Sequence, residues 1–210
     1  MRLLITSILL SILFSSCSLK TTEGLRLVPT LHKTITNPYF ASVATDYVYK
    51  AKINIYGKNL GGILVVKKLG AETHRVVFTT EFGGKIFDFL FEGDTFTKNY
   101  ALEDIDKKLV IGVLEQDFRT LIKEQIVVEK QYLSDESKVY QTVVEKGFKF
   151  YFFTSSDNVL TSIKSTSKHK EKFEILFTSI ASEKHKTADK IDIIHENIKL
   201  KIHLDYLKNN

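Results

Sequence analysis

The sequence contains few of the residues that cross-link a chain or interrupt a strand. Its 210 residues include one cysteine, Cys17, two prolines, Pro29 and Pro38, and no tryptophan. A single cysteine excludes an intramolecular disulfide, so the domain must be stabilised by its own core. Because both prolines precede residue 39, no proline interrupts a strand farther along the chain. The chain is long enough to bury such a core in one domain.

Charge of one sign is not concentrated anywhere in the chain. The formal net charge is +5, with Arg2 included, and the basic residues are spread without a long run. A nucleic-acid-binding surface requires a concentrated basic stripe, so no nucleic-acid partner is predicted. The mild basic excess is compatible with anionic lipid head groups and with many other partners.

The N-terminus has the pattern of a secretory signal. Met1 and Arg2 supply a short positive region, and residues 3–14 are apolar apart from three hydroxyl residues. A run of this length is too short to cross the ~30 Å core of a bilayer as a helix. We therefore predict a signal peptide over residues 1–16.

Small residues stand directly before the only cysteine. Ser15, Ser16 and Cys17 resemble the end of a bacterial lipoprotein signal, although Phe14 stands where that pattern usually has leucine. The resemblance implies that Cys17 becomes the acylated first residue of the mature protein and anchors it in membrane lipid. Ser18 is compatible with passage to the outer membrane, because aspartate at this position signals retention. The alternative is an ordinary signal peptide in which the cysteine is incidental.

The mature chain divides into a tether and one domain. Residues 17–45 are mostly polar, with scattered apolar residues, and are predicted to be the acylated cysteine and its tether. Residues 39–44 either form a short helical turn or continue the tether. Residues 46–210 contain no repeat, low-complexity tract or composition shift, and are predicted to form a single domain.

Strand patterns begin near residue 47. Tyr47, Tyr49, Ala51, Ile53 and Ile55 alternate with mostly polar residues, which is typical of a half-buried strand. Short glycine-bearing connections separate the runs that follow, as in an antiparallel meander of five strands. The later runs cover residues 63–69, 75–82, 85–91 and 95–102.

The period then changes to that of a helix. Between Glu103 and Lys123, apolar residues recur at three-to-four spacing, with Asp104 as a plausible cap. Either Gly112 or the pair at residues 116–117 divides this segment into two helices, or it forms one. Strand patterns return and continue to residue 207, so the predicted fold is mainly β with a helical insertion after about five strands.

This order of elements resembles the LolA/LolB superfamily of bacterial lipoprotein carriers and receptors. The resemblance implies a curved, incomplete antiparallel β-barrel with a helical lid, formed by residues 46–210. It also implies a protein that binds acyl chains or lipoproteins and receives them or inserts them into the outer membrane, with lipoproteins or a periplasmic carrier as partners. The stretches that carry the likeness are AKINIYGKNLGGILVVKK (51–68), RVVFTTEFGGKIFDF (75–89), DKKLVIGVLEQDFRTLI (106–122) and IHENIKLKIHLDYL (194–207).

The resemblance implies a role for the aromatic residues. Each methylene removed from water gains ~0.8 kcal/mol, so a protein that holds an acyl chain needs an apolar concavity. Read residue by residue, the same aromatics are ordinary core material between sheet and helix. The predicted lining residues are Phe78, Phe87, Phe89, Phe91, Phe96 and Phe118, with the aromatic run at residues 148–153.

One turn matches a functional loop of the family. The outer-membrane receptor displays an exposed apolar residue just before a glycine, in the turn between its third and fourth strands, and this residue helps to push acylated cargo into the membrane. The matching residue here is Phe82, followed by Gly83 and Gly84. The resemblance therefore implies a membrane-insertion loop. The alternative is that Phe82 folds back onto the sheet.

No catalytic or metal-binding constellation is recognisable. His185, His195 and His203 lack the spacing of metal ligands and are interpreted as surface residues. Asp88 and Glu92 are interpreted as solvent-facing charges. The sequence contains no nucleophile elbow, phosphate loop or dinucleotide fingerprint. We therefore predict no enzyme activity, no metal and no cofactor.

Together these patterns predict a lipid-anchored, monomeric protein on the periplasmic face of the outer membrane that binds acyl chains or lipoproteins. The alternative is a structural or interaction lipoprotein, an accessory subunit of an envelope assembly whose sheet is filled by its own side chains. A third possibility, an envelope hydrolase, would require a polar constellation in a cleft.

Overall fold

The computed structural model describes residues 19–180 and 187–207. The predicted signal peptide, Cys17, Ser18 and His185 lie outside these residues. In the described ranges, no helix combines the length and apolar character that crossing a membrane requires.

Five strands in succession follow the predicted meander. Each pairs with the next in antiparallel fashion. In the first of them, the alternating side chains from Tyr47 to Ile55 are buried, as the sequence predicts. The strands are β3 (Asp46–Ile55), β4 (Lys58–Gly70), β5 (Thr73–Thr79), β6 (Lys85–Glu92) and β7 (Thr95–Ala101).

A 15-residue helix, α2 (Lys108–Ile122), follows the meander. Its buried side chains, Leu114 and Phe118 among them, recur at the spacing of an amphipathic helix. The helix begins at Lys108 rather than at the predicted residue 103. Asp104 does not cap it and instead forms an ion pair with Lys58, at 2.8 Å.

The second half of the chain returns to strands. Residues 125–133 form two strands rather than one, and between them Val128 N–H donates to Lys33 O and Glu129 N–H donates to Gln141 O. The strands are β8 (Gln125–Val127), β9 (Lys130–Leu133), β10 (Ser137–Val144), β11 (Gly147–Thr154), β12 (Leu160–Thr166), β13 (Glu171–Ile180), β14 (Ala188–His195) and β15 (Leu200–Tyr206).

The segment predicted as a tether is part of the folded unit from residue 20 onward. It contains the 3-10 helix η1 (Lys20–Thr22) and two short strands, β1 (Arg26–Val28) and β2 (Thr34–Thr36). Strand β1 pairs with β9, and β2 pairs with β8 in a separate two-stranded sheet. Scattered apolar residues in a polar segment are too few to reveal strands that depend on partners about 100 residues away.

Residues 37–40 are buried and connect three parts of the domain. Asn37 Nδ2 donates to Leu121 O at 2.9 Å, and Tyr39 Oη donates to Leu160 O at 2.7 Å. Phe40 is 1 % exposed although its φ is +63°, a conformation that L residues rarely adopt. These contacts hold the start of the domain against α2 and β12.

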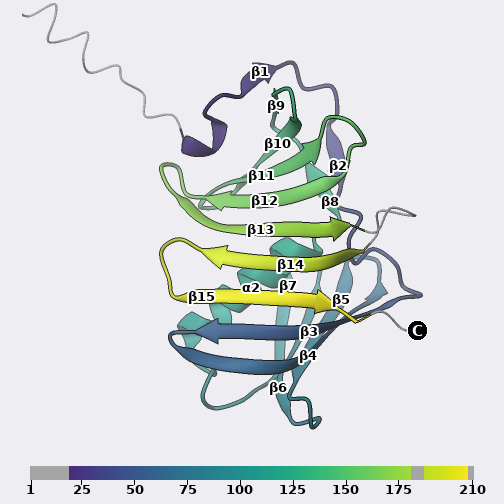
Figure 1. Cartoon of the computed structure of the whole chain (residues 1–210), viewed down its shortest axis with the longest axis vertical. Coiled ribbons are helices and arrows are strands. Elements are labelled where there is room, and N and C mark those ends of the chain that lie inside the picture. The colour runs from purple at the N-terminus through teal and green to yellow at the C-terminus, as the bar shows by residue number, and fades with distance from the viewer. Residues whose placement is uncertain (1–18, 181–186, 208–210) are drawn as a thin grey trace, which may run out of the picture.

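The strands form one 13-stranded antiparallel sheet that curves around α2 (Figure 1). Strand order is β1-β9-β10-β11-β12-β13-β14-β15-β3-β4-β5-β6-β7, so β1 and β7 form two edges and the sheet stays open. Pairing of the last strand, β15, with β3 joins the two halves of the chain. The predicted curved, incomplete barrel with a helix inserted after five meander strands is confirmed.

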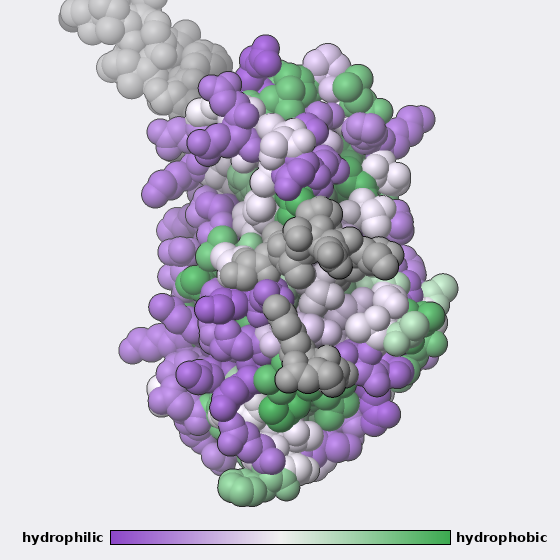
Figure 2. Space-filling model, turned by 45° about the vertical axis from the view of Figure 1, so that its right-hand side comes forward, coloured by the Kyte–Doolittle hydropathy of each residue, from purple (hydrophilic) through white to green (hydrophobic). Residues whose placement is uncertain are grey.

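The face of the molecule drawn in Figure 2 is mainly hydrophilic. In Figure 2, the hydrophobic side chains of this face occur in small, separate groups.

One carboxylate of β6, Asp88, is buried, contrary to the prediction that it faces solvent. It accepts hydrogen bonds from Arg75, at 2.6 and 2.9 Å, and from Lys85 and Asn99. The hydrogen bonds from Arg75, more than the others, hold the pKa of Asp88 well below its usual range.

Candidate functional site

The aromatic side chains on the concave face form a packed cluster. Five of the six predicted cavity residues are at most 2 % exposed, and Phe96 is half-buried against them. Phe87 stacks on Phe89 with ring centroids 4.5 Å apart and contacts Phe118 of α2 at 5.6 Å. In this structure the six rings pack against one another, and their role as the lining of an acyl cavity stays a prediction. Large rings from β5, β6 and α2 meet at contact distance and fill the space between them.

Open space remains beside the C-terminal half of α2. A groove of about 500 Å³ lies between this helix, the turns after β4 and β6, and strands β8, β10 and β11. That volume falls within the ~300–1,000 Å³ typical of small-molecule sites. The groove is lined by Glu72, Gly93, Asp94, Arg119, Lys123, Gln125, Ile126, Val127, Thr142, Val143, Val144, Lys149 and Tyr151.

Strand register places a row of side chains beside this groove and under the helix. Thr142 of β10 is opposite Lys149 of β11, which is opposite Ser165 of β12. The row continues through Phe173 of β13 to His195 of β14. Directly opposed residues of antiparallel strands project from the same face. Lys149 therefore lies on the concave face, between two hydroxyl residues.

Lys149 is half-buried, and its ammonium group is desolvated. Burial, more than the nearby charge of Arg119, lowers the pKa of Lys149 to about 8. Asp117 attracts it and Lys123 repels it. Within the part of the chain that the structure describes, no carboxylate forms an ion pair with Lys149. A desolvated charge without an ion-pair partner lowers the free energy of unfolding.

Because of this penalty, the free energy of unfolding should increase as the pH rises through the pKa of Lys149. The unfolded chain keeps the Lys149 proton up to about pH 10.5, whereas the folded chain releases it near pH 8. Below pH 8 the folded state carries the full penalty, and the penalty disappears as the pH rises from 8 to 10.5. We expect Lys149→Met to be more stable than the wild type at pH 7, by about 1–3 kcal/mol. Urea unfolding should show this difference shrinking at pH 10, and a difference independent of pH would contradict the assignment.

A buried acid–base pair fastens α2 to the sheet. Asp117 of α2 is 0 % exposed, and its carboxylate oxygens lie 2.9 and 3.0 Å from His195 Nε2 of β14. Burial raises the pKa of the Asp117 carboxyl group, and the hydrogen bond from His195 acts in the opposite direction. The His195 ring also packs on Phe173, with ring centroids 5.0 Å apart. The prediction that His195 is a surface residue is therefore wrong.

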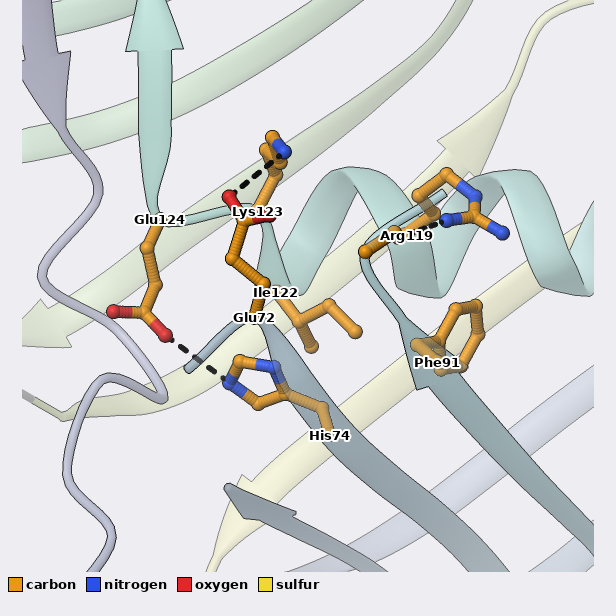
Figure 3. A pocket seen from close by; sticks show the side chains of 8 residues that line it. Glu72, His74, Phe91, Arg119, Ile122, Lys123 and Glu124 are labelled. Atoms are coloured by element: carbon orange, nitrogen blue, oxygen red, sulfur yellow. Dashed lines mark hydrogen bonds and ion pairs between the residues drawn. The ribbon is translucent and has the colours of Figure 1, made fainter. Parts of the chain in front are cut away.

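A smaller cavity of about 30 Å³ lies at the end of α2, with room for about one water molecule. Figure 3 shows Arg119 beside Phe91, whose ring centroid is 5.3 Å from the guanidinium carbon. Arg119 donates to Gly93 O at 2.8 Å, and Lys123 lies 3.4 Å from Glu72. Phe91 thus lines a cavity, but one far too small for an acyl chain.

A second cluster of polar groups lies on the other side of this small cavity. His74 Nε2 lies 3.5 Å from Glu124 (Figure 3). The same nitrogen donates to Phe40 O at 3.0 Å, and Glu124 pairs with Lys68. Burial lowers the pKa of His74, and the hydrogen bond to Phe40 O and the charge of Glu124 act in the opposite direction. The hydrogen bonds from His74 to Phe40 O and from Asn37 N–H to Glu124 O hold residues 37–40 in place.

Phe82 lies at the tip of the β5–β6 hairpin and is 100 % exposed. Thr80 organises this turn, because its N–H donates to Gly84 O at 2.8 Å and its carbonyl accepts from Gly83 N–H at 3.0 Å. Gly83 has a φ of +85°, which favours glycine. The alternative in which Phe82 folds back onto the sheet is wrong.

The sequence matches no model of a known protein family and no curated protein. It does match solved structures. The LolA superfamily protein NE2245 from Nitrosomonas europaea is 8 % identical, and the match covers 81 % of this chain and 88 % of that one, with a TM-score of 0.52. The fold is LolA-like.

Two further solved structures are more distant. A DUF1329 family protein from Desulfovibrio piger is 9 % identical over 78 % of this chain and 84 % of its own, with a TM-score of 0.41. A domain assigned to outer membrane lipoprotein sorting, from Vibrio parahaemolyticus, is 4 % identical over 78 % and 83 %, with a TM-score of 0.43. The LolA-like assignment is carried by the Nitrosomonas structure, and at this identity it concerns the fold alone.

Sequence reasoning did not identify Lys149, Asp117 or His195 as site residues of the LolA-like domain. One signal was present: Lys149 is the only charged residue in the aromatic run FKFYFF, residues 148–153. A charge in a run that is otherwise apolar is a candidate for a special environment. The Asp117–His195 contact joins residues 78 positions apart and left no local signal.

Proposed function

We propose that the protein is a lipid-anchored protein of the bacterial outer membrane, facing the periplasm, that binds acyl chains of lipids or lipoproteins without catalysis. Acylated Cys17 would hold it to the membrane. The protein would act as a monomer and exchange cargo with a periplasmic carrier or with the membrane.

The observation that carries this proposal is the groove beside α2 in a LolA-like half-barrel. The groove is open to solvent and its wall includes the apolar side chains of Ile126, Val144 and Tyr151. An acyl chain in it would exchange water for apolar contact without any chemical step. Because the aromatic cluster is filled, a longer chain would need α2 to move away from the sheet.

Lipid that remains with the purified protein would test this proposal. The chain from Ser18 onward contains every described element and lacks the predicted anchor, so any acyl chain it carries is bound and not attached. We expect mass spectrometry of the extracted protein to detect acyl lipid near one equivalent. Protein that carries no lipid and takes up none from added vesicles would refute the proposal.

A second candidate function is favoured by the filled aromatic cluster. A structural or interaction lipoprotein, acting as an accessory subunit of an envelope assembly, needs no hollow and has its sheet occupied by its own side chains. Failure of the lipid experiment would support this function.

We expect Phe82 to contact the bilayer surface. Burying a phenylalanine side chain gains about 1.5–3 kcal/mol, so Phe82→Ser should weaken binding of the chain from Ser18 to vesicles about tenfold. Sedimentation with phosphatidylethanolamine–phosphatidylglycerol vesicles measures this loss. The control is Tyr56→Asn, because Tyr56 is an aromatic residue at another hairpin tip, 49 % exposed, and asparagine tolerates its positive φ. Equal binding by the wild type and Phe82→Ser would show that the turn does not reach the membrane.

A further inference from the structure

The groove beside α2 is lined by three cations, by the carboxylates of Glu72 and Asp94, and by an apolar wall. Arg119 and Lys123 come from the helix, and Lys149 comes from β11 on the concave face. Ile126, Val127, Val144 and Tyr151 provide the apolar part of the lining, and Val127 is 71 % exposed. A ligand that satisfies both parts must be an anion joined to a hydrocarbon.

The three cations differ in the hydrogen bonds and ion pairs that they form with other groups of the protein. Arg119 is held by Gly93 O at 2.8 Å and by Glu115 at 2.9 Å, and Lys123 lies 3.4 Å from Glu72. The charge of Asp117 attracts Lys149, but the Asp117 carboxylate is hydrogen-bonded to His195. Lys149 therefore keeps an unbalanced charge at the most desolvated point of the three.

The cross-strand neighbours of Lys149 are hydroxyl residues. Thr142 and Ser165 flank it on the concave face, and neither can neutralise an ammonium group. Ammonium, guanidinium and hydroxyl groups are the donors that proteins use to bind phosphate oxygens. The charge and its surroundings are complementary to a phosphate group.

We propose that this groove binds an acyl lipid with an anionic, phosphate-bearing head group, with the phosphate at Lys149 and the hydrocarbon along Ile126, Val127, Val144 and Tyr151. This inference rests on the proposed function and narrows its ligand class. The acyl groups of a lipoprotein's modified cysteine carry no negative charge, so they would leave Lys149 unbalanced. A phospholipid with net negative charge offsets it.

Lys149→Met tests the proposal, since methionine keeps an unbranched side chain and removes the charge. The assay is fluorescence-detected binding of chain-labelled phosphatidylglycerol and phosphatidylcholine to the chain from Ser18. We expect Lys149→Met to weaken phosphatidylglycerol binding about tenfold and to change phosphatidylcholine binding less than about twofold. Lys149→Arg should retain the preference for phosphatidylglycerol.

The control for charge is Lys146→Met. Lys146 is an exposed residue in the turn between β10 and β11, so this variant has the same net charge as Lys149→Met and an intact groove. We expect it to bind both lipids as the wild type does. Because Lys149→Met is expected to be at least as stable as the wild type at pH 7, a loss of binding cannot be attributed to unfolding. Millimolar inorganic phosphate should not displace the lipid, since it lacks the hydrocarbon.

The outcomes separate this inference from the proposed function. If the wild type binds neither lipid, both fail. If it binds the two lipids equally and Lys149→Met changes nothing, the head-group assignment fails while acyl-chain binding stands. If Lys149→Met weakened the binding of both lipids equally, the head-group assignment would also be overturned, because Lys149 would then act through the shape of the groove. Displacement by phosphate alone would reassign the groove to a small anion.

Discussion

Replacing His195 with alanine is expected to lower the free energy of unfolding by about 3–5 kcal/mol at pH 7. The substitution leaves the Asp117 carboxyl group, which is 0 % exposed, without its hydrogen-bond donor. It also leaves a cavity beside the Phe173 ring. Urea denaturation followed by circular dichroism measures the loss.

His203→Ala is the matched control for this prediction. His203 also contacts two carboxylates, Asp192 at 2.7 Å and Asp205 at 3.0 Å, but its side chain is 37 % exposed. Ion pairs open to water contribute about 0–1 kcal/mol, so this variant should lose little. If the two histidine variants lost the same stability, burial would not be the reason for the strength of the Asp117–His195 contact.

A double variant separates the unpaired charge from the cavity. Replacing Asp117 and His195 together with leucine removes both polar groups and keeps the volume filled. A buried pair replaced by well-packed apolar residues is often close to neutral. We therefore expect the double variant to recover most of the stability that His195→Ala loses. Recovery of none would show that packing on Phe173, not charge, dominates.

This pair also bears on the proposed lipid binding. It joins α2 to β14, and the helix must shift if a long hydrocarbon is to reach the aromatic cluster. Weakening the contact should make that shift easier, because a ligand gains only the difference between its affinities for the two states. The same contact therefore stabilises the closed form and opposes deeper binding.

Gly62→Ala is the second change with a large expected effect. A Cβ atom at residue 62 would overlap the carbonyl oxygen of Thr79 on β5 and lie 3.1 Å from the Phe78 ring. Neither neighbour has space to retreat, because Phe78 is 0 % exposed in the core. The β4–β5 pairing would have to shift, so we expect a loss of about 3 kcal/mol or more. Thermal unfolding measures it.

The adjacent glycine supplies the control. A Cβ at Gly61 meets nothing within 4 Å, so Gly61→Ala should leave the folded state unchanged. By restricting the unfolded chain it should stabilise the protein by up to about 1 kcal/mol. Similar destabilisation by both variants would mean that strand flexibility, and not the close approach to Thr79, requires glycine here.

The periodicity of the sequence was sufficient to predict the meander and the helix. Alternation from Tyr47 to Ile55 and the three-to-four spacing around Leu114 and Phe118 are local patterns, and each reports which face of one element is apolar. The open, curved sheet was implied by the resemblance of this order of elements to the LolA/LolB superfamily, and not by the periodicity itself. The turn after Phe82 was also predictable, because paired glycines mark a hairpin, but the sequence left open whether Phe82 is exposed or folds back onto the sheet.

Local patterns failed where a residue's environment comes from distant segments. The apparent tether contributes Tyr39 and Phe40 to the core because β12 and β5 offer them hydrogen-bond partners. Asp88 is buried because Arg75 of the neighbouring strand covers it. The same limit applies to the aromatic rings, since whether they surround a hollow or fill it depends on the distance of α2 from the sheet.

By itself, the sequence determined the type of each main element, the position of the turn after Phe82, and the mainly β architecture. Only the tertiary structure decided that the aromatic face is filled, that the open space lies beside the end of α2, and that Lys149 faces it unpaired. The physical reason is that alternation and helical period depend on neighbours within a few residues. Cavities and charge pairs depend on side chains that meet only after the sheet has curved around its helix.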